Sequence, residues 1–526
     1  MSSNAAAPPP TGRGMTIADQ IARHARTIPD QRAVTFEGAH LTWRQLDERT
    51  SRLANALRQR GTVRGDRVAV LGLNRTEVLE AYFAAVRLGA ICVPLNFRLA
   101  ADELAHALAD SGSRIAVVDA ALAEPLAKAR EQVPDVEHCL VFGSSAADDD
   151  YERALAQASP EFGELRVDEH EPAFIMYTSG TTGRPKGAVL THANLLMHTF
   201  SQMIHTGVLP DDRVWLAAAP LFHIAGLSGM LPTLLLGGRV VILPTGQFDP
   251  AATVDLLERE RVTSTFMVPA QWQAICAVPD LAERDLSALK RLSWGAAPAP
   301  TSLLRALFAA FPGADVSTAF GQTECSPVTT QLRGEDAEAK IGSIGTPMLN
   351  VEVRVVDDDM NDVPQGEVGE IVYRSPMVMR EYWNKPAETA EAFRGGWFHS
   401  GDLVRQDSDG YFYVVDRKKD MIISGGENIY CAEVEDVLAG HPQIREVALI
   451  GVPHPTWGES PLAVLSVEDG AAAPSADELR SWCTDRLASY KRPREVAVLS
   501  ALPRNPSGKV LKTQLRDDHA AGKLPG

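Results

Sequence analysis

A segment of ten residues that is rich in glycine, hydroxyl groups and cations gives the clearest indication of chemistry in this chain. It runs from Thr178 to Gly187, with the sequence TSGTTGRPKG, and follows an apolar stretch, Ala173–Tyr177, that predicts a buried strand. Glycine lets the backbone take positive φ and approach a ligand closely. Successive N–H groups in such a loop can form a concave site for an anion. The segment therefore predicts a loop that binds nucleotide phosphates, although Gly187 follows the lysine and excludes a Walker A motif.

The longer string YTSGTTGRPKG resembles the phosphate loop of the adenylate-forming (ANL) superfamily, which includes acyl-CoA synthetases, aryl-CoA ligases, luciferases and adenylation domains. A flexible Gly/Thr turn is the alternative, but other segments agree with the resemblance in their order along the chain. The resemblance implies ATP as a substrate and Thr178 as a catalytic residue. The loop residues that it assigns to ATP are Thr178, Ser179, Gly180, Thr181, Thr182, Gly183 and Lys186.

One further segment resembles a nucleotide-binding motif of this superfamily, and a second, which taken alone is a common loop, suits a purine by its small residues. The first, AFGQTE, matches the YGxTE motif with Phe320 in place of tyrosine. The resemblance implies that Phe320 stacks near adenine, that Thr323 approaches the α-phosphate, and that Glu324 is catalytic and holds Mg²⁺. A hard cation prefers carboxylate and phosphate oxygens, which suits Glu324. The second segment is a loop of small residues that lets a purine lie against the backbone. The other residues assigned to ATP here are Gly321, Gln322, Gly295, Ala296, Ala297 and Pro298.

A third pair of motifs lies nearer the C-terminus. Asp402, in HSGD, resembles the TGD motif, which implies a carboxylate that binds the ribose hydroxyls. Arg417 and Lys419 lie in DRKKD, which resembles the family hinge, with Arg417 on the ribose and Lys419 as the pivot. A turn-capping aspartate and a solvated run of charges are the alternatives, the second being serious for Lys418.

The last part of the chain resembles the family's CoA-binding and catalytic segments. Lys509, in PRNPSGK, matches the catalytic lysine that bridges the carboxylate and ATP. The resemblance assigns the pantetheine tunnel to Ser424, Gly425, Gly426 and Glu427. Cations and aromatic rings suit a phosphorylated adenosine, although each such residue could equally be ordinary surface. On that basis the CoA nucleotide is assigned to Arg98, Trp457, Tyr490 and Arg492.

An apolar segment around His223, PLFHIAG, matches the family's acyl pocket. A lone histidine in such a segment is more often a satisfied core residue than a catalyst, so we assign it to the lining of the pocket. The lining residues that we predict are His223, Ile224, Gly226 and Trp294. The small residues Ala225, Gly226, Ser228 and Gly229 are expected to leave room, which favours a long or bulky acyl group over acetate.

These motifs need a scaffold, and the pattern of the chain predicts an α/β fold. Short apolar runs alternate with helical patterns from Thr16 to about Tyr413, which favours largely parallel sheets with ligands at the carboxyl ends of the strands. The β-rich runs 351–357, 367–374 and 411–415 suggest a barrel-like or antiparallel portion. We expect a disordered tail (1–15), a large N-terminal domain of αβα layers (16–415), a hinge (416–420) and a small mobile α+β domain (421–526).

Composition limits the classes of partner and compartment. The 526 residues have a net charge of −17, which disfavours general binding to nucleic acid. Six scattered cysteines without CxxC spacing indicate reduced thiols and a cytoplasmic protein. The N-terminus lacks the apolar core of a signal peptide, and Met15 is an alternative start. The longest apolar region, 214–244, is interrupted by proline and glycine, so we expect a buried helix between strands and no integral membrane segment. Peripheral membrane contact stays open if the acid is a lipid.

Taken together, the chain resembles the fatty-acid–CoA ligases of actinobacteria, most closely in GGWFHSGDL and DRKKDMIISGGENIY. The resemblance implies that a carboxylic acid and ATP·Mg²⁺ form acyl-AMP and pyrophosphate, and that CoA then displaces AMP. A medium- or long-chain fatty acid is the expected substrate, and an aryl acid is the nearest alternative. The sequence leaves open a carrier-protein acceptor, a luciferase-like oxygenase, a non-catalytic sensor, and the homodimer that is common in the family.

Overall fold

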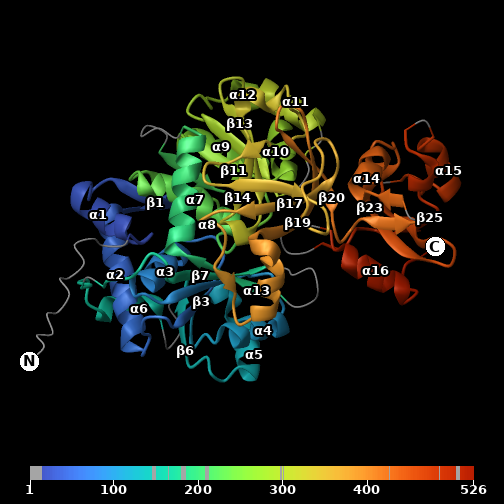
Figure 1. Ribbon diagram of the computed structural model, residues 1–526. Coiled ribbons are helices and arrows are strands. Elements are labelled where there is room, and N and C mark those ends of the chain that lie inside the picture. The colour runs from blue at the N-terminus through green and yellow to red at the C-terminus, as the bar shows by residue number, and fades with distance from the viewer. Residues whose placement is uncertain are drawn as a thin grey trace, which may run out of the picture. The chain divides into compact units, whose positions relative to one another are not determined.

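The chain forms two compact units in the computed structural model (Figure 1). The first comprises residues 1–352 and 373–398, and the second comprises residues 353–372 and 399–526. The structure describes residues 15–144, 150–163, 165–178, 185–207, 213–296, 299, 301–425, 427–468, 470–484, 486–504 and 510–525. The predicted hinge, 416–420, falls inside the second unit, and the domain boundaries drawn from the sequence stay predictions.

One sheet of the first unit has a parallel centre made of strands that are buried on both faces. The residues of β4 and β5 are all buried, as expected for parallel strands covered by helices. At one edge the pairing is antiparallel, between β7 and β8 and between β8 and β18. Within the described ranges the sheet order is β18 (Glu381–Tyr382), β8 (Lys186–Thr191), β7 (Pro172–Thr178), β4 (Ile91–Leu95), β3 (Arg67–Leu71), β5 (Ile115–Asp119) and β6 (His138–Phe142).

The second sheet of this unit is also parallel through its centre, from β13 to β1, and antiparallel at both edges. Its hydrophobic core gathers around Trp272, which is fully buried. In the described ranges the order is β15 (Thr346–Pro347), β14 (Val328–Leu332), β13 (Asp315–Gly321), β12 (Arg291–Gly295), β11 (Ser264–Met267), β9 (Val214–Ala217), β10 (Arg239–Ile242), β1 (Arg32–Phe36) and β2 (Ala39–Thr42).

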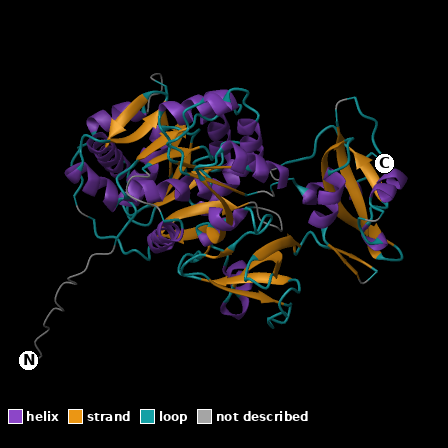
Figure 2. Cartoon of the chain, turned by 90° about the horizontal axis from the view of Figure 1, so that it is seen from above, coloured by secondary structure: helices purple, strands orange, loops and turns teal. Residues whose placement is uncertain are grey.

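Helices flank the strands of the first unit (Figure 2). Several begin at side chains that cap the free N–H groups of the first turn, such as Thr42 before α2 and Thr191 before α7. Their bounds are α1 (Asp19–Thr27), α2 (Trp43–Gln59), α3 (Thr76–Arg87), α4 (Ala101–Ser111), α5 (Ala123–Gln132), α6 (Tyr151–Gln157), α7 (His192–His205), α8 (Ile224–Leu235), α9 (Pro250–Arg259), α10 (Pro269–Cys276), α11 (Thr301–Ala310), α12 (Gly334–Ala337) and α13 (Pro386–Ala392).

The long apolar region 214–244 divides into β9, α8 and β10, as the sequence predicts. Helix α8 is buried along nearly its whole length because it packs against β9 and α7. Within the residues that the structure describes, no helix is long and apolar enough to cross a membrane.

The second unit contains a four-stranded sheet and an α+β part. The first agrees with the β-rich runs of the sequence and has the order β16 (Glu352–Val356), β17 (Gly369–Arg374), β19 (Phe398–Gln406) and β20 (Phe412–Arg417). In the α+β part, β22 (Glu427–Ile429), β21 (Ile422–Ser424), β24 (Gly458–Val467) and β23 (Ile444–His454) form a sheet that β25 (Glu495–Val498) extends from β24. Its helices are α14 (Cys431–Ala439), α15 (Ala476–Trp482) and α16 (Lys512–Ala520).

Candidate active site

The strands that flank the predicted phosphate loop form an antiparallel hairpin. Strand β7 ends at Thr178, β8 begins at Lys186, and these two residues are opposite each other in the register. A Cβ atom at Gly187 would lie 2.5 Å from Cγ2 of Ile175, so any other residue there would force Ile175 or the strand to shift. The loop residues Ser179, Gly180, Thr181, Thr182 and Gly183 lie outside the described residues, and their role stays a prediction.

Tertiary contacts bring Glu324 to the base of this hairpin. Glu324 lies in a short 3-10 helix, Thr323–Cys325, that follows β13, and it is 7% exposed. Its Oε1 accepts a hydrogen bond from the Tyr382 hydroxyl at 2.8 Å and lies 3.5 Å from Oγ1 of Thr178. Nζ of Lys186 lies 5.2 Å from the centre of the Tyr382 ring. Lys186 and Glu324 therefore both lie against Tyr382, and Thr178 lies beside Glu324.

Sequence reasoning did not identify Tyr382. Strand β18 is only two residues long, and it reaches the site because Tyr382 pairs with Ala188 of β8. Burial and the neighbouring Glu324 carboxylate raise the pKa of Tyr382, which keeps its hydroxyl protonated and able to donate. Thr178, Glu324 and Tyr382 form a polar cluster that holds one carboxylate in a fixed orientation.

The predicted adenine loops lie at the carboxyl ends of two adjacent parallel strands. Gly295 ends β12 and is opposite Ala319 of β13. A Cβ atom at Gly295 would overlap the carbonyl oxygen of Ala319, and Ala296 follows with φ +66°, so the chain turns sharply here. Ala297 and Pro298 lie outside the described residues.

The motif at the end of β13 is also closely packed. Phe320 is half-buried and Gly321 has φ +151°, and a Cβ atom at Gly321 would overlap the carbonyl oxygen of Pro327. The N–H of Gln322 donates to that same carbonyl at 2.9 Å. Thr323 opens the short helix that carries Glu324. The backbone between Phe320 and Glu324 is therefore tightly constrained.

In the second unit, the two residues predicted to contact the ribose are paired with each other. Asp402 on β19 is opposite Arg417 on β20, and Nε of Arg417 lies 2.7 Å from Oδ1 of Asp402. The Asp402 side chain is almost fully buried. Lys419 follows Arg417 closely and is half-buried, and this burial, with the cations around it, lowers its pKa.

Among the residues predicted to bind CoA, Gly425 and Trp457 come together. The N–H of Gly425, at φ +63°, donates to the Trp457 carbonyl at 2.8 Å. The Trp457 ring is exposed, and the Arg494 guanidinium lies 5.0 Å from its centre. Arg494 was not predicted as a site residue, and the feature of the sequence that could have pointed to it is the cluster of cations KRPR, residues 491–494. Ser424 pairs with Glu427 across β21 and β22.

The other predicted CoA residues are more scattered. Gly426 lies outside the described residues. Arg492 donates to the Leu487 carbonyl and to Oγ1 of Thr484, each at 3.1 Å, and Tyr490 packs beside a core cluster of the α+β part. Arg98 belongs to the first unit, where its guanidinium lies 5.0 Å from the centre of the Phe97 ring. The catalytic lysine of the prediction, Lys509, is outside the described residues.

His223 caps the N-terminus of α8 in the predicted acyl pocket. Its Nδ1 accepts the N–H of Ala225 at 3.2 Å, and burial lowers its pKa. The ring is therefore neutral with its proton on Nε2, in agreement with a lining role and not an acid–base role. Ile224 is buried beside it. Trp294 is 8% exposed and packs in the core cluster around Trp272.

The expectation that small residues leave room beside His223 is wrong for the two glycines. A Cβ atom at Gly226 would overlap the carbonyl oxygen of Pro220, and one at Gly229 would lie 2.5 Å from Cζ2 of Trp215. Backbone and an indole ring occupy that space, so these glycines allow close packing of α8 and provide no acyl cavity.

The loop before His223 is held by two residues that the sequence did not single out. Asn74 accepts the Leu221 N–H at 2.8 Å and donates to the carbonyls of Ala219 and Leu243 at 3.2 and 3.3 Å. The Tyr82 hydroxyl donates to the Leu221 carbonyl at 3.0 Å. Both residues are buried, so this loop has a fixed conformation.

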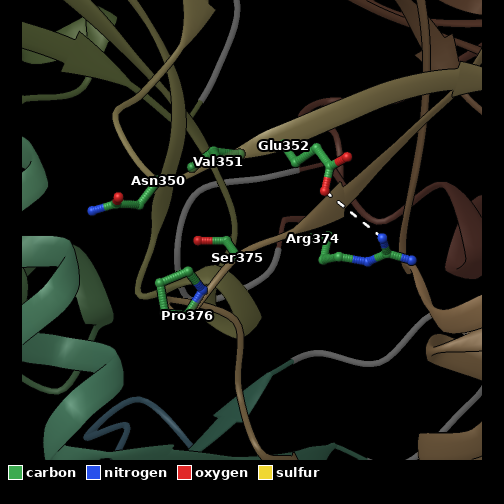
Figure 3. A pocket seen from close by; sticks show the side chains of 6 residues that line it. All are labelled: Asn350, Val351, Glu352, Arg374, Ser375 and Pro376. Carbon is green, nitrogen blue, oxygen red and sulfur yellow. Dashed lines mark ion pairs between the residues drawn. The ribbon is translucent and has the colours of Figure 1, made fainter.

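An open groove of about 590 Å³ also lies on the first unit (Figure 3). Glu352 and Arg374 point toward each other across it, 3.8 Å apart, and the Arg374 guanidinium lies 4.3 Å from the centre of the Trp397 ring. The groove is lined by Asn350, Val351, Glu352, Arg374, Ser375 and Pro376. None of the predicted site residues is among them.

Comparisons with known proteins identify the family of this chain. The family model of AMP-binding enzymes matches residues 21–383, and that of the AMP-binding enzyme C-terminal domain matches residues 433–509. A feruloyl-CoA synthase of Amycolatopsis sp. is 45% identical over 499 residues, which are 94% of this chain and 97% of the relative. The long-chain-fatty-acid–CoA ligase FadD13 of Mycobacterium tuberculosis is 38% identical over 91% of this chain and 93% of the relative.

A solved structure matches as well. The O-succinylbenzoate CoA synthetase of Bacillus subtilis, in complex with ATP and magnesium ion, has a TM-score of 0.84 and 31% identity. The match covers 95% of this chain and 99% of that structure's chain. The predicted fold class is thereby confirmed. The chain belongs to the AMP-binding enzyme family, and its motifs and architecture are those of the AMP-forming acid–CoA ligases.

Proposed function

We propose that this protein joins an aryl carboxylic acid, of the size and type of a hydroxycinnamate, to CoA with cleavage of ATP to AMP and pyrophosphate. The observation that carries this proposal is the 45% identity with a feruloyl-CoA synthase over nearly the whole length of both chains. A medium- or long-chain fatty acid is the substrate expected from the sequence. The filled space at Gly226 and Gly229 does not choose between the two kinds of acid, because the small residues were expected only to favour a long or bulky acyl group over acetate.

The first step needs positive charge, because a carboxylate must approach the α-phosphate. Two unit charges about 4 Å apart repel by roughly 4 kcal/mol at an effective dielectric of about 20. Lys186 would supply positive charge that offsets this repulsion, and the N–H groups predicted for the phosphate loop would add to it. The hydroxyl of Thr178, held beside Glu324, would donate to a phosphate oxygen.

Glu324 fits a site for Mg²⁺. It offers a buried carboxylate whose orientation Tyr382 fixes. Among the described residues, no cluster of three or more histidine, cysteine or acidic side chains could hold a metal. One carboxylate, completed by phosphate oxygens and water, is how Mg²⁺ commonly binds. When bound there, the ion would supply Lewis-acid polarisation of the phosphate oxygens.

The remaining roles follow the family pattern and form part of the proposal. Asp402 and Arg417 would bind the ribose, and Lys509 would bridge the acid carboxylate and ATP during adenylation. Movement of the C-terminal part about Lys419 would then replace Lys509 with Ser424–Glu427 for the attack of the CoA thiol. Residues Arg98, Trp457, Tyr490 and Arg492 would contact CoA.

The test is AMP release by the purified protein with Mg²⁺ and ATP, with and without CoA. The acids are ferulate, cinnamate, benzoate and fatty acids of increasing length, and mass spectrometry identifies the thioester. We expect ferulate or a close analogue to give CoA-dependent AMP with kcat/KM at least about tenfold above any fatty acid, a difference of about 1.4 kcal/mol. A Glu324→Gln variant is the matched inactive control.

A fatty acid is the second candidate, supported by the 38% identity with a long-chain-fatty-acid–CoA ligase. Turnover of fatty acids alone in the same panel would replace the aryl proposal with this one. AMP release without any CoA thioester would point to a carrier-protein acceptor.

A further inference from the structure

A buried carboxylate on β17, Glu370, lies at the centre of a hydrogen-bond network next to the predicted ribose contacts. The side chain is 4% exposed. Its Oε1 accepts the N–H of Gly401 at 3.0 Å, and its Oε2 accepts from Nζ of Lys418 at 3.0 Å and lies 3.1 Å from Nδ1 of His399. We call Glu370, His399, Gly401 and Lys418 the Glu370 cluster.

The cluster keeps this carboxylate ionised in spite of its burial. Burial alone would raise the pKa of Glu370, but the hydrogen bonds from His399, Lys418 and Gly401 outweigh it and lower the pKa. Charge-assisted hydrogen bonds of this kind are the strong ones, and they fix geometry as well as charge.

Two successive residues of β17 hold the part of β19 that carries Asp402. Glu370 accepts the N–H of Gly401, where a φ of +70° bends the strand. At the next position along β17, the Ile371 carbonyl accepts the Ser400 hydroxyl at 2.6 Å, and that hydroxyl oxygen accepts the Asp402 N–H at 2.9 Å. The backbone of Asp402 is therefore anchored through its two preceding residues.

The same carboxylate also holds the strand that carries Arg417. Lys418, which the sequence suggests is solvated, bonds to Glu370 through Nζ and donates its N–H to the Gly401 carbonyl at 2.9 Å. Nε of Arg417 forms an ion pair with Oδ1 of Asp402 at 2.7 Å, and the guanidinium also donates to the Ser400 carbonyl at 3.3 Å. Glu370 thus contacts both segments that carry the Asp402–Arg417 pair, through Gly401 and through Lys418.

We propose that Glu370 is a positioning residue for the nucleotide ribose, which acts by holding Gly401 and Lys418 so that Asp402 and Arg417 face the ribose hydroxyls in a fixed geometry. This inference rests on the proposed function, in which those two residues bind the ribose of ATP. The alternative is a carboxylate that only stabilises the four-stranded sheet.

The experiment measures discrimination between ATP and its 2′-deoxy and 3′-deoxy analogues, as ratios of kcat/KM for AMP release. We expect the parent protein to favour ATP by on the order of tenfold or more, the effect of one hydrogen bond to a charged group. Asp402→Asn should abolish most of this preference, and Glu370→Gln should do the same while leaving the KM for the acid unchanged.

A matched control is available in Asp358, which also contacts Lys418, at 2.6 Å, but is 85% exposed. Asp358→Asn should keep the full preference for ATP. In the double variant Glu370→Gln/Asp402→Asn the losses should not add, because both changes act on one contact. If Glu370→Gln does not fold, Lys418→Met removes one arm of the cluster and should reduce the preference partially.

Two results would overturn the inference. A Glu370→Gln protein that keeps the preference for ATP, while Asp402→Asn loses it, would leave Glu370 with a structural role only. If the parent protein shows no preference for ATP over the deoxy analogues, Asp402 does not contact the ribose hydroxyls, and the inference about Glu370 is wrong as well. That result would not touch acid–CoA ligation, which the panel of acids tests separately.

Discussion

Replacing Asn74 with aspartate tests how the loop before His223 is held. The two side chains have the same shape, so the acceptor toward the Leu221 N–H remains. The amide N–H groups that donate to Ala219 and Leu243 are lost, and an oxygen then faces two carbonyl oxygens. A buried group left without its partner costs about 1–3 kcal/mol, so two such losses give roughly 2–6 kcal/mol.

The effect should depend on pH in a defined direction. Burial among carbonyl oxygens raises the pKa of the new carboxyl in the folded state above its unfolded value of about 3.9. The unfolded chain therefore releases its proton first as pH rises, and the variant loses stability until the folded-state pKa is passed. The difference from the parent protein should be larger at pH 7 than at pH 5.

Chemical denaturation at both pH values, followed by tryptophan fluorescence, measures the stability. Because the loop precedes His223, KM for the acid should rise on the order of tenfold while KM for ATP stays constant. Tyr82→Phe, which removes a single bond to the Leu221 carbonyl, is the milder control and should cost about 1 kcal/mol. An Asn74→Asp protein within about 0.5 kcal/mol of the parent, a change typical of neutral surface positions, would refute the reasoning.

Three further predictions concern packing, buried histidine and metal. Gly226→Ala should destabilise the protein by more than about 1 kcal/mol because the new methyl group overlaps backbone, whereas Gly246→Ala, which meets open space, should be neutral; equal unfolding midpoints would contradict this. Burial lowers the pKa of His198 to about 3, so stability should fall as pH drops below about 6.5, by about 2 kcal/mol at pH 5. His198→Gln should show that much less pH dependence in urea unfolding, and parallel curves would exclude the explanation. Glu324→Gln should reduce AMP release by roughly 100-fold and raise the Mg²⁺ concentration for half-maximal activity, and an unchanged Mg²⁺ dependence would place the metal elsewhere.

Local sequence was sufficient for several of the strands and for the positions of the motifs. Strand β7 was expected at Ala173–Tyr177 and spans Pro172–Thr178, and the apolar region 214–244 contains the expected buried helix. These features depend on periodicity and on residues that are close in sequence. Glycines such as Gly187 and Gly295 were recognisable by residue type, although their purpose, close approach to Ile175 and to the Ala319 carbonyl, was visible only in the structure.

The side chains that position the candidate site residues could be identified only from the tertiary structure. Tyr382 reaches Glu324 across 58 residues, and Asn74 reaches the loop at Leu221 across 147. Glu370 is one acidic residue among many in the sequence, and only the pairing of β17, β19 and β20 surrounds it with donors. The prediction that Gly226 leaves room was wrong for the same reason. The sequence gives the size of a residue, but whether the space beside a glycine is empty depends on the segment that packs there. The sequence by itself determined the chemistry that the chain carries, and the long-range contacts decided which side chains hold that chemistry in place.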